Sequence, residues 1–184
     1  MHFSSAGRLA WMRPGGDWVD ALGKVHGDKP FAESTVASAS SAQPIEWDVL
    51  PLLAEWSSGK VPSGSMLLRV APGAPAGPAN FASREHADGS LAPILTVRWS
   101  DGQVERLRPV ADTFFACPTI KNLGGSTQLR VGAELTSLLE FAFKPRPGHT
   151  VSSLSLGLTP LRLFGRSLRI GLYGLQLPQT TKPA

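Results

Sequence analysis

Three aspartates are the side chains best suited to hold a metal ion: Asp17, Asp20 and Asp112. Loop carboxylates can bind calcium together with backbone carbonyl groups, without a local sequence motif. Calcium is therefore the one cofactor that the sequence allows for, and none is required. The sequence has no nucleophile elbow, no phosphate loop and no pair of histidines with ligand spacing. We therefore expect that the protein is not an enzyme.

Two further groups of residues are candidates for ligand binding. Trp11, Trp18 and Trp47 can stack on sugar rings, and burial in a core or an interface is the alternative for each of them. Arg84 and Glu85 are adjacent in a predicted strand, so their side chains should point to opposite faces. We expect one of the two to pair within the fold and the other to reach solvent.

Charge and composition exclude some classes of partner. The chain has 184 residues and a net charge of +4, and its 18 lysines and arginines are scattered. No basic run of the kind found in nucleic-acid tails occurs, so no nucleic-acid partner is expected. No apolar stretch approaches the length of about 18 residues that a membrane span needs. The lone Cys117 excludes an intrachain disulfide, and its apolar neighbours indicate a small core residue.

The elements that must position these residues are mostly strands. The 19 glycines and 16 prolines suit a fold with many turns. One helix is predicted at about residues 48–58, where Asp48 serves as N-cap and Val49, Leu53 and Trp56 form an apolar stripe. The sequence predicts an all-β fold, a jelly-roll β-sandwich with this one short helix. The predicted strands are 34–38, 65–70, 81–84, 94–99, 112–117, 128–131, 138–143, 150–158 and 166–175.

Several of these segments carry motifs in a recognisable order. Asp48 to Trp56 is followed by Leu67-Leu68-Arg69, then by Phe81-Ala82-Ser83-Arg84-Glu85 and Pro93-Ile94-Leu95-Thr96-Val97. Ala111-Asp112-Thr113-Phe114-Phe115 then opens a second series of strands. The chain resembles the DNRLRE family, related to the disaggregatase repeat, with its short helix ending in Trp, its F-x-S-R-E signature and its closing P-x-L-x-V strand. The resemblance implies a jelly-roll β-sandwich module, and some members of the family bind carbohydrate.

The two halves of the family pattern stand in reverse order. Residues 17–99 resemble its closing half and residues 109–177 its opening half, with a linker at 100–108 and terminal arms at 1–16 and 178–184. We expect one β-sandwich over residues 1–184, a circular permutant that closes on itself. Two alternatives stay open. The chain can be a window across two tandem modules, or a swapped protomer whose opening half completes the next molecule.

Two classes of function follow from these features. The first is a non-catalytic structural protein of a larger assembly, such as a virion decoration or tail component, with copies of itself or other subunits as partners and with glycan contact as an added role. The start of the chain lacks the apolar region of a secretory signal, which predicts synthesis in the cytoplasm and delivery to a virion or extracellular assembly. A trimmed fragment would instead be extracellular. The alternative function, implied by the resemblance, is a carbohydrate-binding module for an acidic polysaccharide.

Overall fold

The computed structural model describes residues 9–13, 16–37, 43–75, 77–116, 123–163, 167–176 and 179–180. The described chain is an all-β sandwich with one short α-helix, which confirms the fold class predicted from the sequence. The strands are β1 (Leu9–Ala10), β2 (Trp18–Val19), β3 (Ala32–Val36), β4 (Ile45–Asp48), β5 (Ser65–Val70), β6 (Ala79–Ala82), β7 (Ile94–Trp99), β8 (Val104–Leu107), β9 (Pro109–Ala116), β10 (Gln128–Val131), β11 (Leu135–Phe141), β12 (Val151–Leu158), β13 (Pro160–Leu163), β14 (Leu168–Leu175) and β15 (Gln179–Thr180).

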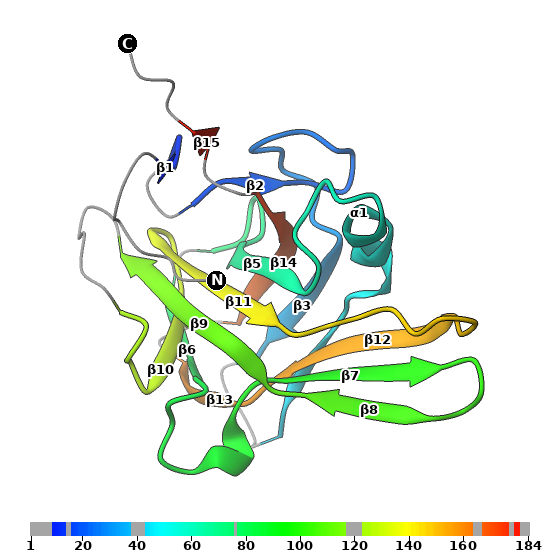
Figure 1. Cartoon of the computed structure of the whole chain (residues 1–184). Helices are drawn as coiled ribbons and strands as arrows, with labels where there is room; N and C mark the ends of the chain where they lie inside the picture. Colours follow the sequence, from blue (N-terminus) through cyan, green and yellow to red (C-terminus); the bar gives the residue numbers. More distant parts are fainter. Residues whose placement is uncertain are drawn as a thin grey trace.

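Three antiparallel sheets and one short strand pair make up the sandwich (Figure 1). The largest sheet has the strand order β2-β14-β5-β11-β9, with β3 also paired to β14. A four-stranded sheet has the order β4-β12-β7-β8, and a three-stranded sheet has the order β10-β6-β13. In Figure 1 the four-stranded sheet extends to the lower right, below β5, β11 and β14. The pair β1 and β15 brings the two ends of the described chain together.

The central strands of the six-stranded sheet, β5, β11 and β14, are largely buried on both faces. Side chains alternate between the faces of a strand, and on β5 the side chains of Met66 and Leu68 enter the main core between the sheets. Leu67, between them, belongs to a second cluster on the outer face. The main core also contains Trp47 and Phe81, whose rings meet edge to face with centroids 6.1 Å apart. Burial on both faces explains why β5 contains the uninterrupted apolar run Met66-Leu67-Leu68.

The helix begins later than the sequence predicted. Asp48 is the last residue of β4, and a 3-10 turn, η1 (Leu50–Leu52), leads into α1 (Leu53–Ser57). The Asp48 carboxylate still accepts a hydrogen bond from the Leu50 N–H (3.0 Å), so it caps the turn from within the strand. Trp56 is buried on the sheet side, as its spacing predicted. A second 3-10 turn is η2 (Gly89–Leu91), and among the described residues no helix is long and apolar enough to span a bilayer.

The segment 100–108, expected to be a linker, contains a strand. In this segment β8 pairs with β7 in a tight hairpin and returns the chain to the start of β9. The strands of 17–99 and 109–177 interleave within the one chain: β5 lies between β11 and β14, and β6 lies between β10 and β13. The strand predicted at 81–84 lies two residues earlier in the structure, as β6 (Ala79–Ala82). Cys117 and most of the predicted arms lie outside the described residues.

Substitution of two glycines with positive φ distinguishes the cost of backbone strain from the cost of a steric clash. A methyl group added at Gly59 (φ 73°) would point into open space, whereas a Cβ on Gly64 (φ 81°) would collide with the Phe141 backbone carbonyl. We expect Gly59→Ala to lower the free energy of unfolding by about 1 kcal/mol. Gly64→Ala should cost about 1–3 kcal/mol more, because the collision is added to the strain. Urea denaturation of both variants measures this difference, and equal losses would contradict the described packing.

Candidate functional site

The tryptophans proposed as sugar platforms lie largely inside the fold. Trp47 is fully buried, and its Nε1 donates a hydrogen bond to the Ile170 carbonyl (2.9 Å). Trp18 is 6% exposed, and its Nε1 donates to the Gly27 carbonyl (2.9 Å). Trp11 is half-buried against the outer-face cluster. Of the two interpretations of Trp18 and Trp47, the structure bears out burial: both rings are covered, and each indole N–H is bonded to a backbone carbonyl.

Asp17, a predicted metal ligand, is buried and fully engaged. Its Oδ2 accepts a hydrogen bond from the Met12 N–H (2.9 Å), and its Oδ1 accepts one from the Arg13 N–H (3.2 Å). The same Oδ1 lies 2.7 Å from His26 Nε2. His26 adopts a left-handed backbone conformation (φ 54°), which turns its ring back toward the carboxylate. Asp17 thus joins the segment before β2 to the loop after it.

Asp20, the second predicted ligand, holds the same loop from inside. Its carboxylate accepts hydrogen bonds from the backbone N–H groups of Leu22 (2.9 Å), Lys24 (2.8 Å) and Lys29 (3.3 Å). Burial acts to raise the pKa of Asp20, but these backbone donors together bring it below its ordinary value. N–H donors occupy the lone pairs that a cation would need. Among the described residues, no group of three or more His, Cys, Asp or Glu side chains is arranged to hold a metal ion.

Aromatic and cationic groups fix the loop to the outer face of the sheet. The Arg69 guanidinium lies 4.1 Å from the Trp18 ring centroid and 5.5 Å from that of Tyr173. Burial raises the pKa of Tyr173 to about 12, so its hydroxyl stays protonated and donates to the Asp28 carbonyl (3.2 Å). Trp18 and His26 also meet edge to face, with centroids 4.9 Å apart. The loop over residues 17–29 is therefore held from several sides.

This fixed loop exposes apolar side chains. Leu22 is 72% exposed, Val25 is 40% exposed, and Met12, whose N–H is bonded to Asp17, is 50% exposed. We call Met12, Leu22 and Val25 the loop patch. The sequence interpretation missed it, although one signal was present: Leu22 is an apolar residue between Asp20 and Gly23, at the tip of a turn where polar residues are usual.

Arg84 and Glu85 form a structural clasp with Ser83 and Asp112. They lie in the turn after β6, not in a strand, so their side chains do not point to opposite faces: Arg84 Nε and Glu85 Oε1 are 2.9 Å apart. The Arg84 guanidinium donates to the Val110 carbonyl, and the Arg84 N–H donates to Asp112 Oδ2 (2.7 Å). The strand prediction was wrong here because β6 ends two residues earlier. The clasp ties this turn to β9.

Asp112, the third predicted metal ligand, is buried at the centre of this clasp. It is 4% exposed, and its Oδ1 has no hydrogen-bond partner within the described structure. Burial raises the pKa of this carboxyl to about 6, against the lowering effect of the Arg84 N–H and guanidinium; Glu85 adds to the increase. Asp112 thus keeps its proton up to about pH 6 in the folded protein.

The outward face of the four-stranded sheet is polar. Cross-strand register places Asp48 beside Ser155, Ser155 beside Thr96, and Thr96 beside Arg106, so one row of polar side chains crosses all four strands. We call this row and its exposed neighbour Arg98 the polar face. Its acidic groups lie on β4, and its basic groups lie on β7 and β8. The alternation of serine with leucine along β12 predicted one wet face correctly.

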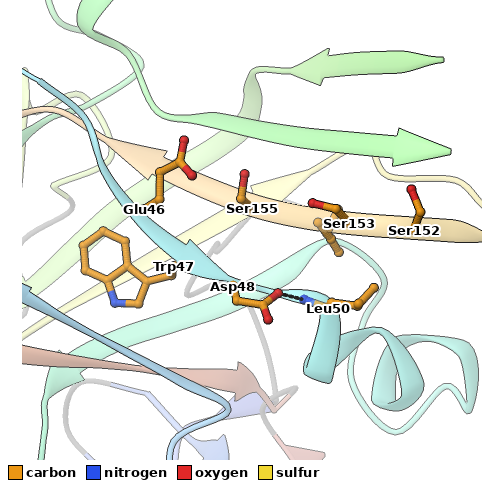
Figure 2. Close-up of a pocket in the computed structure, with 8 residues that line it drawn as sticks. Glu46, Trp47, Asp48, Leu50, Ser152, Ser153 and Ser155 are labelled. Carbon is orange, nitrogen blue, oxygen red and sulfur yellow. Dashed lines mark hydrogen bonds between the residues drawn. The ribbon is translucent and has the colours of Figure 1, made fainter. Parts of the chain in front are cut away.

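An open hollow of about 250 Å³ lies on this face over the paired strands β4 and β12 (Figure 2). Glu46 and Ser155 extend to the same side of the sheet in Figure 2, while the Trp47 ring is directed away from them. Glu46, Asp48, Ser153 and Ser155 contribute polar groups to the hollow, and Leu50 contributes apolar surface. The hollow is thus a shallow, partly apolar depression with two carboxylates on one side.

Comparisons of the chain with protein-family models, with curated proteins and with solved structures give no match.

The raised pKa of Asp112 predicts how stability depends on pH. The folded state holds this proton up to about pH 6, whereas the unfolded carboxyl loses it near 3.8, so the contribution to stability is present at acid pH and is lost as the pH rises through 6. Asp112→Asn keeps an oxygen acceptor for the Arg84 N–H. We expect its free energy of unfolding, relative to that of the wild type, to be about 2 kcal/mol higher at pH 7.5 than at pH 4.5. Urea unfolding at both pH values measures this. A difference between the two proteins that does not change with pH would disprove it.

Proposed function

We propose that the chain is a non-catalytic structural subunit of a larger assembly, of the kind that virion decoration and tail components represent. The observation that carries this proposal is the loop patch: Leu22 is 72% exposed at the tip of a loop that Asp20 holds through three backbone hydrogen bonds. An exposed apolar side chain in a fixed conformation loses little conformational entropy when a partner covers it. Partners are copies of the chain or other subunits of the assembly.

The charged groups of the fold support the same proposal. Asp17 and Asp20 are used to fix the loop, and Arg84 is used to tie a turn to β9. Apolar residues at the surface then become the natural contact points between subunits.

The mass of the protein in solution tests the proposal. Light scattering after size exclusion, from micromolar to millimolar concentration, should give masses above the 19.5 kDa of one chain, rising with concentration. Assembly from copies of the chain is contradicted if the mass stays at that of one chain at every concentration.

A second function has its own support in the polar face. Hydroxyl, carboxylate and guanidinium groups of Ser155, Asp48 and Arg106 lie in register across the four-stranded sheet, and such a row of polar groups can bind a polysaccharide chain. The exposed side chains of Arg98 and Arg106 suit acidic sugars. The resemblance to the DNRLRE family implies the same class of ligand. On this alternative the chain is a carbohydrate-binding module for an acidic polysaccharide.

Calorimetric titration with polygalacturonate and with neutral dextran tests this alternative. We expect binding of the acidic polymer only, weakened about tenfold by Arg98→Ala or Arg106→Ala, since each removes one charge-assisted hydrogen bond. Arg169→Ala is the matched control, because Arg169 lies on β14 and pairs with Glu33 (3.2 Å). Equal weakening by the control variant would show that only net charge matters and would contradict a site on the polar face.

A further inference from the structure

We propose that copies of this chain join head to tail, with Leu22 of one copy seated in the hollow over β4 and β12 of the next. The inference rests on the proposed role as an assembly subunit and names the contact that builds the assembly. Both surfaces belong to the same chain, and they differ in shape and in charge.

The projecting surface is preorganised. Asp20 fixes the turn on either side of Leu22 through the N–H groups of Leu22 and Lys24, and Asp17 fixes the far end of the loop through His26. Leu22 is the most exposed large apolar side chain among the described residues, at 72%. A rigid apolar side chain at the tip of a loop is well suited to act as an anchor in a pocket of a partner.

The receiving surface has room for such an anchor. The hollow measures about 250 Å³, and a cavity of about 150 Å³ is enough to admit a benzene molecule. Leu50, which is partly exposed, supplies apolar surface, and Ser153 and Ser155 leave the site open because their side chains are small. One side of a leucine isobutyl group can therefore rest in this shallow hollow without displacement of the sheet.

Charge makes the two surfaces complementary. Lys24 and Lys29 are exposed on the loop together with one acid, Asp28, so positive charge is in excess there, whereas Glu46 and Asp48 are exposed beside the hollow. Opposite charges around an apolar contact attract the two surfaces before they touch and select their orientation. A contact between two loop patches would instead bring lysines together, so the charges favour a contact between different surfaces.

A contact between two different surfaces is heterologous, and each copy keeps one free loop patch and one free hollow. Such contacts continue from copy to copy until a ring closes, or they extend as a filament. The contact therefore accounts for growth of an assembly from one kind of subunit.

Two variants each disrupt one of the two surfaces and leave the other intact. Leu22→Asp removes the apolar anchor and leaves the hollow intact. The double variant Glu46→Lys with Ser155→Arg reverses one charge and fills the hollow, and it leaves the loop intact. Val110→Asp is the matched control, because Val110 is 46% exposed on β9, away from both surfaces. Thermal unfolding of each variant establishes that it is folded.

Light scattering on single variants and on their mixture tests the contact. Each variant alone should be monomeric, and the control should assemble as the wild type does. An equimolar mixture of Leu22→Asp with the hollow variant should give dimers of twice 19.5 kDa and no larger species, because only one productive contact remains. The dimer should weaken with added salt, since charge contributes to it.

The other outcomes overturn the inference in distinguishable ways. If the wild type assembles and each of the two variants also assembles on its own, this contact is overturned and the proposed function stands. Monomeric variants whose mixture gives no dimer would show that Leu22 does not bind in the hollow. A wild type that stays monomeric at every concentration would overturn both the contact and assembly from copies of the chain.

Discussion

The apolar outer face of the six-stranded sheet must be covered, and much of the structure depends on how that is achieved. Leu67, Leu138 and Tyr173 lie on this face, opposite the main core. Trp18 and the segment around it lie over them, and that segment contains only the two-residue strand β2. Because so short a strand has few ladder hydrogen bonds, the buried carboxylates of Asp17 and Asp20 supply the missing backbone partners.

Side chains also bind backbone carbonyl groups at two sheet edges. The free edge of β9 is covered where the Arg84 guanidinium binds the Val110 carbonyl, and the edge of β4 is covered where the Ser34 hydroxyl binds the Glu46 carbonyl. Edge strands with unpaired carbonyl groups invite unwanted pairing. Side chains that close the edges leave the loop patch and the polar face as the surfaces available for specific contacts.

Sequence patterns predicted the parts of the fold that depend on local periodicity. Alternation of serine and leucine located β12 and its wet face, and the apolar run at 65–70 located β5. Strand β8 was missed because its alternation, with Val104 exposed, is too short to distinguish a strand from a linker. The other errors, in the bounds of β6 and α1, lie at the ends of elements, where turn geometry outweighs periodicity.

The candidate site was harder to predict because it depends on contacts between distant segments. Trp47 is buried through β14, more than one hundred residues away, since its indole binds the Ile170 carbonyl. Asp17 and Asp20 have the chemistry of calcium ligands, but backbone donors from their own loop surround them. The loop patch and the hollow each combine residues of unremarkable type. Only the register of β4 with β12 shows that Glu46, Asp48 and Ser155 share one surface.

The pairing of β14 has a consequence for synthesis on the ribosome. This strand runs from Leu168 to Leu175, and it pairs with β2, β3 and β5, which all lie in the first seventy residues. While residues up to 167 are being made, β5 lacks a neighbour on one side and Trp18 has no complete sheet beneath it. The sandwich can therefore close only after β14 has left the exit tunnel, and the nascent chain must remain protected from aggregation until then.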